Sequence, residues 1–97
     1  MDFIAEKDCI YQKNAEGKLI AEVSFPALSE TTVNIDHTFV DESLRGQGVA
    51  SLLLQATVEK LRRESKKALV TCPYAEQWFR KHPECADVLF RGDEKYF

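Results

Sequence analysis

Residues 37–61 read HTFVDESLRGQGVASLLLQATVEKL, and within them the spacing of the apolar residues changes from that of a strand to that of a helix. The segment 32–40 is rich in β-branched and aromatic residues, which predicts a strand. One face of this strand is expected to carry Val33, Ile35, His37 and Phe39. From residue 48 to residue 64 the apolar residues recur every three or four positions, which predicts one long helix. The chain therefore passes from strand to helix through a short loop at residues 41–47.

Two further strands are expected before this transition. Residues 3–11 alternate loosely between apolar and polar types, as in a half-buried strand. Its apolar face is expected to carry Phe3, Ala5, Cys9 and Tyr11. Residues 14–17 contain Asn and Gly, which favour a tight turn, and from residue 19 apolar residues then recur at every second position until Pro26. These segments predict a hairpin, with residues 32–40 as a third antiparallel strand.

A strand and a second helix are expected after the long helix. Residues 68–71 form a short apolar run, which predicts a buried strand beside the third. A shorter helix is expected at residues 73–81, because the proline at its start suits a first helical turn and His82-Pro83 should end it. Residues 86–90 fit a short helix or a strand, and residues 93–97 are expected to fray or to dock by their aromatic side chains. The fold class is therefore α+β, a mostly antiparallel sheet with one long and one shorter helix.

The composition narrows the class of protein. The chain has 97 residues, the size of one domain, and 44% of them are apolar, enough for a core. A net charge of -3 offers no positive field to nucleic acid or to an anionic membrane. The longest apolar run is residues 52–54 and the N-terminus is acidic, so we expect neither a membrane span nor an export signal. Cys9, Cys72 and Cys85 lack the spacing of a disulfide framework or a metal site, which favours a reducing cytoplasm.

The loop between the third strand and the long helix is the candidate ligand site. It carries the motif Arg45-Gly46-Gln47-Gly48-Val49-Ala50. Glycines allow a tight turn and close approach of a ligand, and the first amides of a helix point at an anion that the helix dipole favours. The pattern therefore predicts a phosphate-binding turn. The alternative is that the two glycines only turn the chain into the helix.

The motif Arg45-x-x-Gly48-x-Ala50 resembles the acetyl-CoA-binding motif of the GCN5-related N-acetyltransferases, which is Gln or Arg, two residues, Gly, one residue, and Gly or Ala. Residues 37–61, together with the Cys-Pro-Tyr of residues 72–74 and the His-Pro-Glu of residues 82–84, are similar to the small, minimal members of that superfamily. The resemblance covers residues 19–89. It implies a minimal fold of this superfamily and a single N-acetyltransferase-like domain at residues 1–97.

The same resemblance implies acetyl-CoA, or coenzyme A, as the cofactor. Its pyrophosphate would then be bound by the loop, through Arg45, Gly46, Gln47, Gly48, Val49 and Ala50. The pantetheine arm would hydrogen-bond to the backbone of Phe39 and Val40, like an added strand, where two strands of the sheet splay apart. Because the chain is shorter than full-length relatives, the resemblance also implies an open acceptor side.

Acetyl transfer to an amine needs a base, donors for the oxyanion and an acid for the leaving thiolate. Aligned with the family, Phe79 stands where the usual Tyr acid would fall, and Tyr74 is either an alternative acid or a buried structural residue. Cys72 precedes a helix, whose N-terminus favours a thiolate that accepts the acetyl group or lies beside the thioester, and its alternative role is packing. His37 is a candidate base, or else a core histidine whose ring nitrogens have hydrogen-bond partners.

Two functions follow from the resemblance. The first is an acetyl-CoA-dependent N-acetyltransferase that acts on an unidentified amine acceptor, with Cys72 or His37 assisting the transfer. The alternative is a non-catalytic module that holds acetyl-CoA or coenzyme A. A third possibility is an interaction domain whose glycines only turn the chain. The expected partners are acetyl-CoA and an unknown acceptor, with no nucleic acid, no membrane and no metal.

Overall fold

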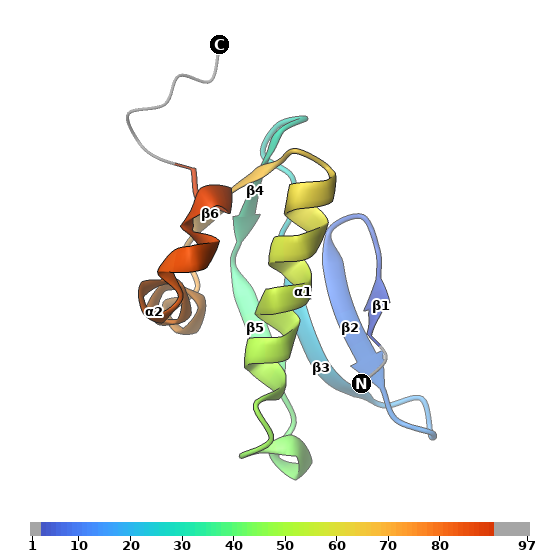
Figure 1. The fold of residues 1–97 in the computed structure, drawn as a ribbon. Coiled ribbons are helices and arrows are strands. Elements are labelled where there is room, and N and C mark those ends of the chain that lie inside the picture. Colours follow the sequence, from blue (N-terminus) through green and yellow to red (C-terminus); the bar gives the residue numbers. More distant parts are fainter. Residues whose placement is uncertain (1–2, 91–97) are drawn as a thin grey trace.

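A computed structural model describes residues 3–90, in which α1 crosses one face of a β-sheet (Figure 1). The strands are β1 (Ile4–Ala5), β2 (Cys9–Lys13), β3 (Leu19–Ser24), β4 (Thr32–Ile35), β5 (His37–Val40) and β6 (Lys67–Val70). The helices are the 3-10 turn η1 (Glu42–Leu44), α1 (Val49–Arg63), α2 (Pro73–Lys81) and the 3-10 helix η2 (Pro83–Val88). Strands β1, β2, β3 and β5 form an antiparallel sheet in that order, and β4 pairs in parallel with β6.

The predicted α+β class is confirmed, and so are its most regular elements. In β3 and just after it, the alternate residues Ala21, Val23 and Phe25 are at most 1% exposed. The long helix is buried through Leu53, Leu54, Thr57, Val58 and Leu61, which recur at helical spacing. Strand β6 lies beside β4, as expected, and α2 begins at Pro73. These elements enclose one cluster of buried apolar side chains.

The first predicted strand is wrong in its length and in its buried face. Instead of one strand at residues 3–11, the chain turns at residues 6–8 and pairs β1 with β2 as a hairpin, with the Glu6 amide donating to the Cys9 carbonyl over 2.8 Å. Ile10 is the buried residue, at 2% exposure, whereas Cys9 and Tyr11 are half-buried. The pairing with β3 places Ile10 opposite the buried Val23, and this contact sets which face lies under α1.

The third predicted strand is also corrected, because a β-bulge at Asp36 divides it into β4 and β5. Ala27 pairs with Val33 and Ser24 pairs with His37, so three steps on one strand oppose four steps on the other. The Asp36 amide donates to the Ser24 carbonyl over 3.2 Å. An extra residue turns every later side chain to the opposite face.

The bulge changes which residues of this strand enter the core. Val33 and Ile35 are buried, as expected, but His37 and Phe39 are exposed. The half-buried residues of β5 are instead Thr38 and Val40.

The C-terminal part of the described chain combines both structures that the sequence left open. Residues 83–88 form η2, and Leu89 then makes a parallel bridge to Ala68 at the edge of β6. The expectation for residues 93–97 lies outside the described residues. Within residues 3–90, no helix has both the length and the apolar character needed to cross a membrane.

Candidate functional site

The loop between β5 and α1 is shaped by its two glycines. Asp41 begins it by accepting hydrogen bonds from the backbone and the hydroxyl of Ser43 at the start of η1, over 3.0 and 2.6 Å. Gly46 and Gly48 then adopt φ angles of +84° and +71°, in the left-handed region that disfavours side chains. Gly48 is the residue that caps α1. The sequence places glycine at both positions where the turn into the helix requires it.

This turn leaves several backbone amides without a partner. Among residues 3–90, the amides of Gly46, Gly48, Val49 and Ala50 donate no hydrogen bond. The Gln47 amide does not match the expectation, because it donates to the Leu44 carbonyl over 3.3 Å. The Arg45 amide donates to the Glu42 carbonyl over 3.1 Å. Unpaired amides at the start of a 15-residue helix form a site for an anion.

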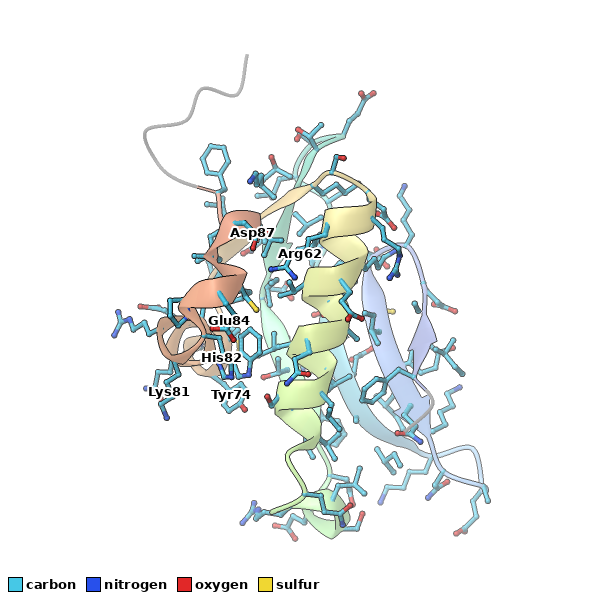
Figure 2. All side chains as sticks on the ribbon, viewed as in Figure 1. Arg62, Tyr74, Lys81, His82, Glu84 and Asp87 are labelled. Atoms are coloured by element: carbon cyan, nitrogen blue, oxygen red, sulfur yellow. The ribbon has the colours of Figure 1, made fainter. Side chains whose placement is uncertain are left out.

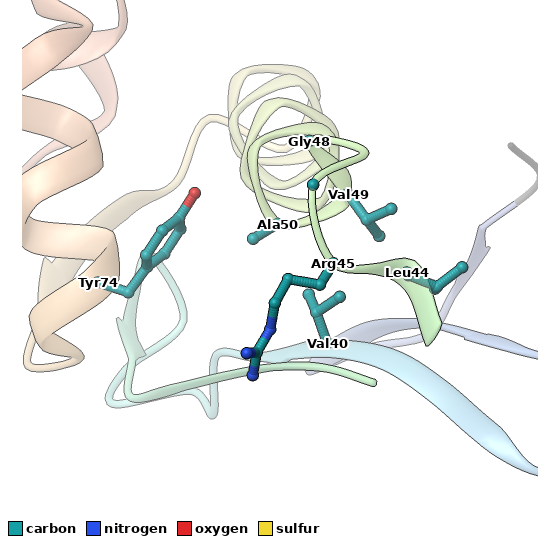
Figure 3. Close-up of a pocket in the computed structure, with 8 residues that line it drawn as sticks. Val40, Leu44, Arg45, Gly48, Val49, Ala50 and Tyr74 are labelled. Carbon is teal, nitrogen blue, oxygen red and sulfur yellow. The ribbon is translucent and has the colours of Figure 1, made fainter. Parts of the chain in front are cut away.

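An open pocket of about 280 Å³ adjoins these amides (Figure 3). It is lined by Val40, Leu44, Arg45, Gly46, Gly48, Val49, Ala50 and Tyr74. Figure 3 shows Tyr74 on the α2 side of the pocket and Val40 and Ala50 on the other. The Arg45 side chain is 80% exposed, and its guanidinium lies 3.9 Å from the Glu42 carboxylate. An exposed cation and a set of unpaired amides therefore share one pocket.

The predicted splay lies at the inner side of this pocket. Strand β6 pairs with β4 only as far as Ile35, whose carbonyl accepts hydrogen bonds from the amides of Thr71 and Cys72. Beyond that point, in the part of the chain that the structure describes, β5 pairs with β3 alone. The Asp41 amide donates to β3, so in an antiparallel ladder the N–H and C=O groups of Val40 and Thr38 face the open edge.

The same ladder corrects the expectation for one cofactor residue. Phe39 and its ladder partner Glu22 direct their backbone groups toward each other, so Phe39 does not offer its backbone to the opening. Val40 does, and it also lines the pocket.

Cys72 lies at this opening, where it caps α2 at 6% exposure. Its sulfur is 3.4 Å from the Thr38 hydroxyl. Burial by itself raises the pKa of the thiol, but the nearby Thr38 hydroxyl and the amides of Ala75, Tyr74 and Thr38 together outweigh burial and leave the pKa of Cys72 below its ordinary value. The amides of Tyr74 and Ala75 at the start of α2 act in the direction expected of a helix N-terminus, although the Cys72 side chain makes no capping hydrogen bond to α2.

The other candidate side chains fall in different places. His37 is exposed and lies on the opposite face of β5 from Thr38, so it is not a core histidine. Tyr74 is 44% exposed in the pocket, which contradicts its interpretation as a buried residue. Phe79 is buried at 5% exposure. Thr38 was missed from the sequence, because the alternating pattern directed attention to His37.

Side-chain hydrogen bonds fix the position of α1 beside α2 and η2. The Trp78 indole donates to the Ser51 hydroxyl over 2.8 Å, in the first turn of α1. At the other end of α1, Arg62 binds the Asp87 carboxylate through two hydrogen bonds of 2.9 and 2.7 Å (Figure 2). The Trp78 contact connects the helix start that carries the free amides to the helix that carries Cys72 and Tyr74.

Comparisons with known proteins agree with this geometry. A family model described as GCN5-related N-acetyl-transferase matches residues 9–88. The protein NATD1 of Xenopus tropicalis is 30% identical over 63 residues, which cover 65% of this chain but only 58% of that protein, and human NATD1 is 29% identical. The chain thus spans less than two thirds of these relatives.

Solved structures show the same fold. A GCN5-like protein from Staphylococcus aureus superposes with a TM-score of 0.75 at 28% identity, over 99% of this chain and 96% of its own. An acetyltransferase from Elizabethkingia anophelis, solved with acetyl-CoA bound, gives a TM-score of 0.58 at 15% identity, over 77% of this chain and 51% of its own. With a family model matching most of its length, this chain belongs to the GCN5-related N-acetyltransferase family.

Proposed function

We propose that this protein binds acetyl-CoA in the pocket at the start of α1 and transfers its acetyl group to an amine. The observation that carries the proposal is the set of unpaired amides at Gly46, Gly48, Val49 and Ala50, which line one pocket with the Arg45 guanidinium. Neutral N–H donors, a helix dipole and an exposed cation are the groups that bind a diphosphate. The donor set of the chain therefore fits the cofactor.

The open edge of β5 supports the position of the pantetheine arm. Val40 and Thr38 direct their backbone groups to the same edge, about 7 Å apart along the strand. An extended arm that pairs with them would run from the loop toward Cys72. The Elizabethkingia protein of the same fold was solved with acetyl-CoA bound, which supports acetyl-CoA as the ligand.

Cys72 is the side chain that we assign to the chemistry. When bound, acetyl-CoA supplies an activated acetyl group and a thiol leaving group. A lowered pKa increases the thiolate fraction of Cys72, and a thiolate beside the open edge of β5 can attack the thioester carbon. His37 stays a predicted base, although its side chain lies on the other face of β5. Tyr74 stays the alternative acid, and its phenol is exposed in the pocket.

A non-catalytic module that holds acetyl-CoA is the second candidate. It is favoured by Phe79, a buried side chain without a proton to give, at the position where the family resemblance implies an acid. The two candidates share the cofactor site and differ only in whether the acetyl group leaves it.

Two measurements test these assignments. Titration with acetyl-CoA should shift the backbone amide signals of Gly46, Gly48, Val49 and Ala50, and no shift there would exclude both functions. Mass spectrometry after incubation with acetyl-CoA should then find one acetyl group on the wild type and none at residue 72 of Cys72→Ser. Absence of that adduct, together with no turnover of a panel of amines, would favour the non-catalytic module.

A further inference from the structure

Thr38 reaches Cys72 only because of the bulge in the preceding strand. The two residues come from separate elements, 34 positions apart in the chain, yet the Thr38 hydroxyl lies 3.4 Å from the Cys72 sulfur. Without the extra residue at Asp36, His37 would face this opening and Thr38 would lie on the outer face of the sheet. The contact is therefore a product of the sheet geometry.

No ionised side chain among the described residues hydrogen-bonds to the sulfur. Strand β4 and the first ten residues of α1 contain no titratable residue, and on β5 His37 points away. On α2, Glu76 is exposed and paired with Arg80, and Tyr74 lines the neighbouring pocket. Lys67 lies at the far end of β6, where it donates to the Asp87 carbonyl. Hence, within residues 3–90, the donors near the Cys72 sulfur are neutral, and the Thr38 hydroxyl is the only side chain among them.

We propose that Thr38 is the positioning residue for Cys72, holding its sulfur beside the open edge of β5 as the thiolate that attacks the thioester. The inference rests on the proposed function and extends it to a residue of β5. When the sulfur is ionised, only the hydroxyl carries a proton, so Thr38 must donate to it.

The reaction step for which Thr38 positions Cys72 is the transfer of the acetyl group from the coenzyme A sulfur to the Cys72 sulfur. Cys72 first loses its proton to solvent, and its sulfur then forms a bond to the acetyl carbon. The bond between that carbon and the coenzyme A sulfur breaks, and the leaving thiolate takes a proton from solvent. As the negative charge moves off Cys72, the Thr38 hydroxyl is freed from the sulfur.

Three proteins test the inference: the wild type, Thr38→Val, which removes the hydroxyl at nearly constant shape, and Thr38→Ser, which keeps it. The readout is the pH midpoint of the Cys72 ¹³Cβ signal in NMR, measured without acetyl-CoA, with circular dichroism at each pH to show that the fold is kept. We expect the Thr38→Val midpoint to rise by about one pH unit, as for loss of a hydrogen bond to a charged group. We expect Thr38→Ser to restore the wild-type midpoint.

The two other cysteines are internal controls in the same spectra. Burial raises the pKa of Cys9 and Cys85, neither has Thr38 as a neighbour, and their midpoints should be the same in all three proteins. A Thr38→Val midpoint equal to that of the wild type, or a Thr38→Ser midpoint equal to that of Thr38→Val, would overturn the inference.

A second experiment separates this inference from the proposed function. Titration of Thr38→Val with acetyl-CoA should shift the loop amides as in the wild type, while the acetyl adduct on Cys72 should form more slowly at pH 7, by up to about tenfold for a rise of one pKa unit. If acetyl-CoA shifts no loop amide even in the wild type, the proposed function fails, although the NMR midpoints still report on Thr38 and Cys72. If the loop responds and the adduct forms equally fast in both proteins, Thr38 has no positioning role.

Discussion

Replacing Gly48 with alanine separates the role of the loop in folding from its role in binding. Gly48 has a φ of +71°, and a methyl group placed on it would meet no atom within 4 Å in the described structure. The cost to stability is therefore that of the backbone conformation alone, roughly 1–2 kcal/mol. For a domain of this size each 1 kcal/mol lowers the melting temperature by about 4–8 °C. Gly48→Ala should fold, with a modestly lower melting temperature.

The same methyl group should weaken binding more than folding. Gly48 lines the pocket and its amide is unpaired, so the methyl would occupy space beside the proposed diphosphate. We expect the Kd for acetyl-CoA, measured by calorimetry, to rise at least about tenfold, which corresponds to 1.4 kcal/mol.

The chain offers a matched control at Gly17. Its φ is +83° and a methyl group there also meets nothing within 4 Å, but it lies in the turn between β2 and β3, outside the lining of the pocket. Gly17→Ala should therefore lose a similar amount of stability and keep the wild-type Kd. If Gly48→Ala binds acetyl-CoA as tightly as Gly17→Ala, the loop does not hold the diphosphate, and the main argument for the site is refuted.

Two further predictions concern the contacts that position α1. Ser51→Ala should lower the free energy of unfolding by about 1 kcal/mol in guanidinium denaturation, because the Trp78 indole loses its acceptor, and a variant as stable as the wild type would contradict this role. The hydrogen bonds from Arg62 hold the pKa of Asp87 below its usual value, despite the opposing effect of burial. That contribution is present above about pH 4 and is lost as the pH falls through the lowered pKa, so Arg62→Met should be less stable than the wild type at pH 7, with a difference that narrows toward pH 3. A difference that stays constant over this range would show that the ion pair is not its source.

Much of the fold was predictable because its elements are encoded over short distances. The alternation in β3 and the helical spacing in α1 each bury one continuous face, and Pro73 marks the start of α2. The turn at the glycine motif was equally predictable from the sequence, since the positive φ angles at positions 46 and 48 favour glycine. Six of the eight predicted cofactor residues line the pocket, and the exceptions are Phe39 and Gln47.

The errors arose where pairing between distant segments overrode a local pattern. Apolar and polar residues alternate imperfectly over residues 3–11. Pairing with β3 places Ile10 opposite the buried Val23, so that Ile10 is the buried residue of β2. Residues 32–40 look like one strand, yet the bulge at Asp36 reverses the faces of β5. No window of a single sequence contains this register, because it is set by where Ser24 and Ala27 lie on the neighbouring strand.

Local chemistry was thus enough to specify a glycine turn at the start of a long helix, because backbone conformation and helix amides depend on residues only a few positions apart. It could not say whether His37 or Thr38 faces Cys72, since one additional residue in a paired strand exchanges the two faces. The identity of the groups around the thiol is a property of strand register, and register exists only once the sheet has assembled.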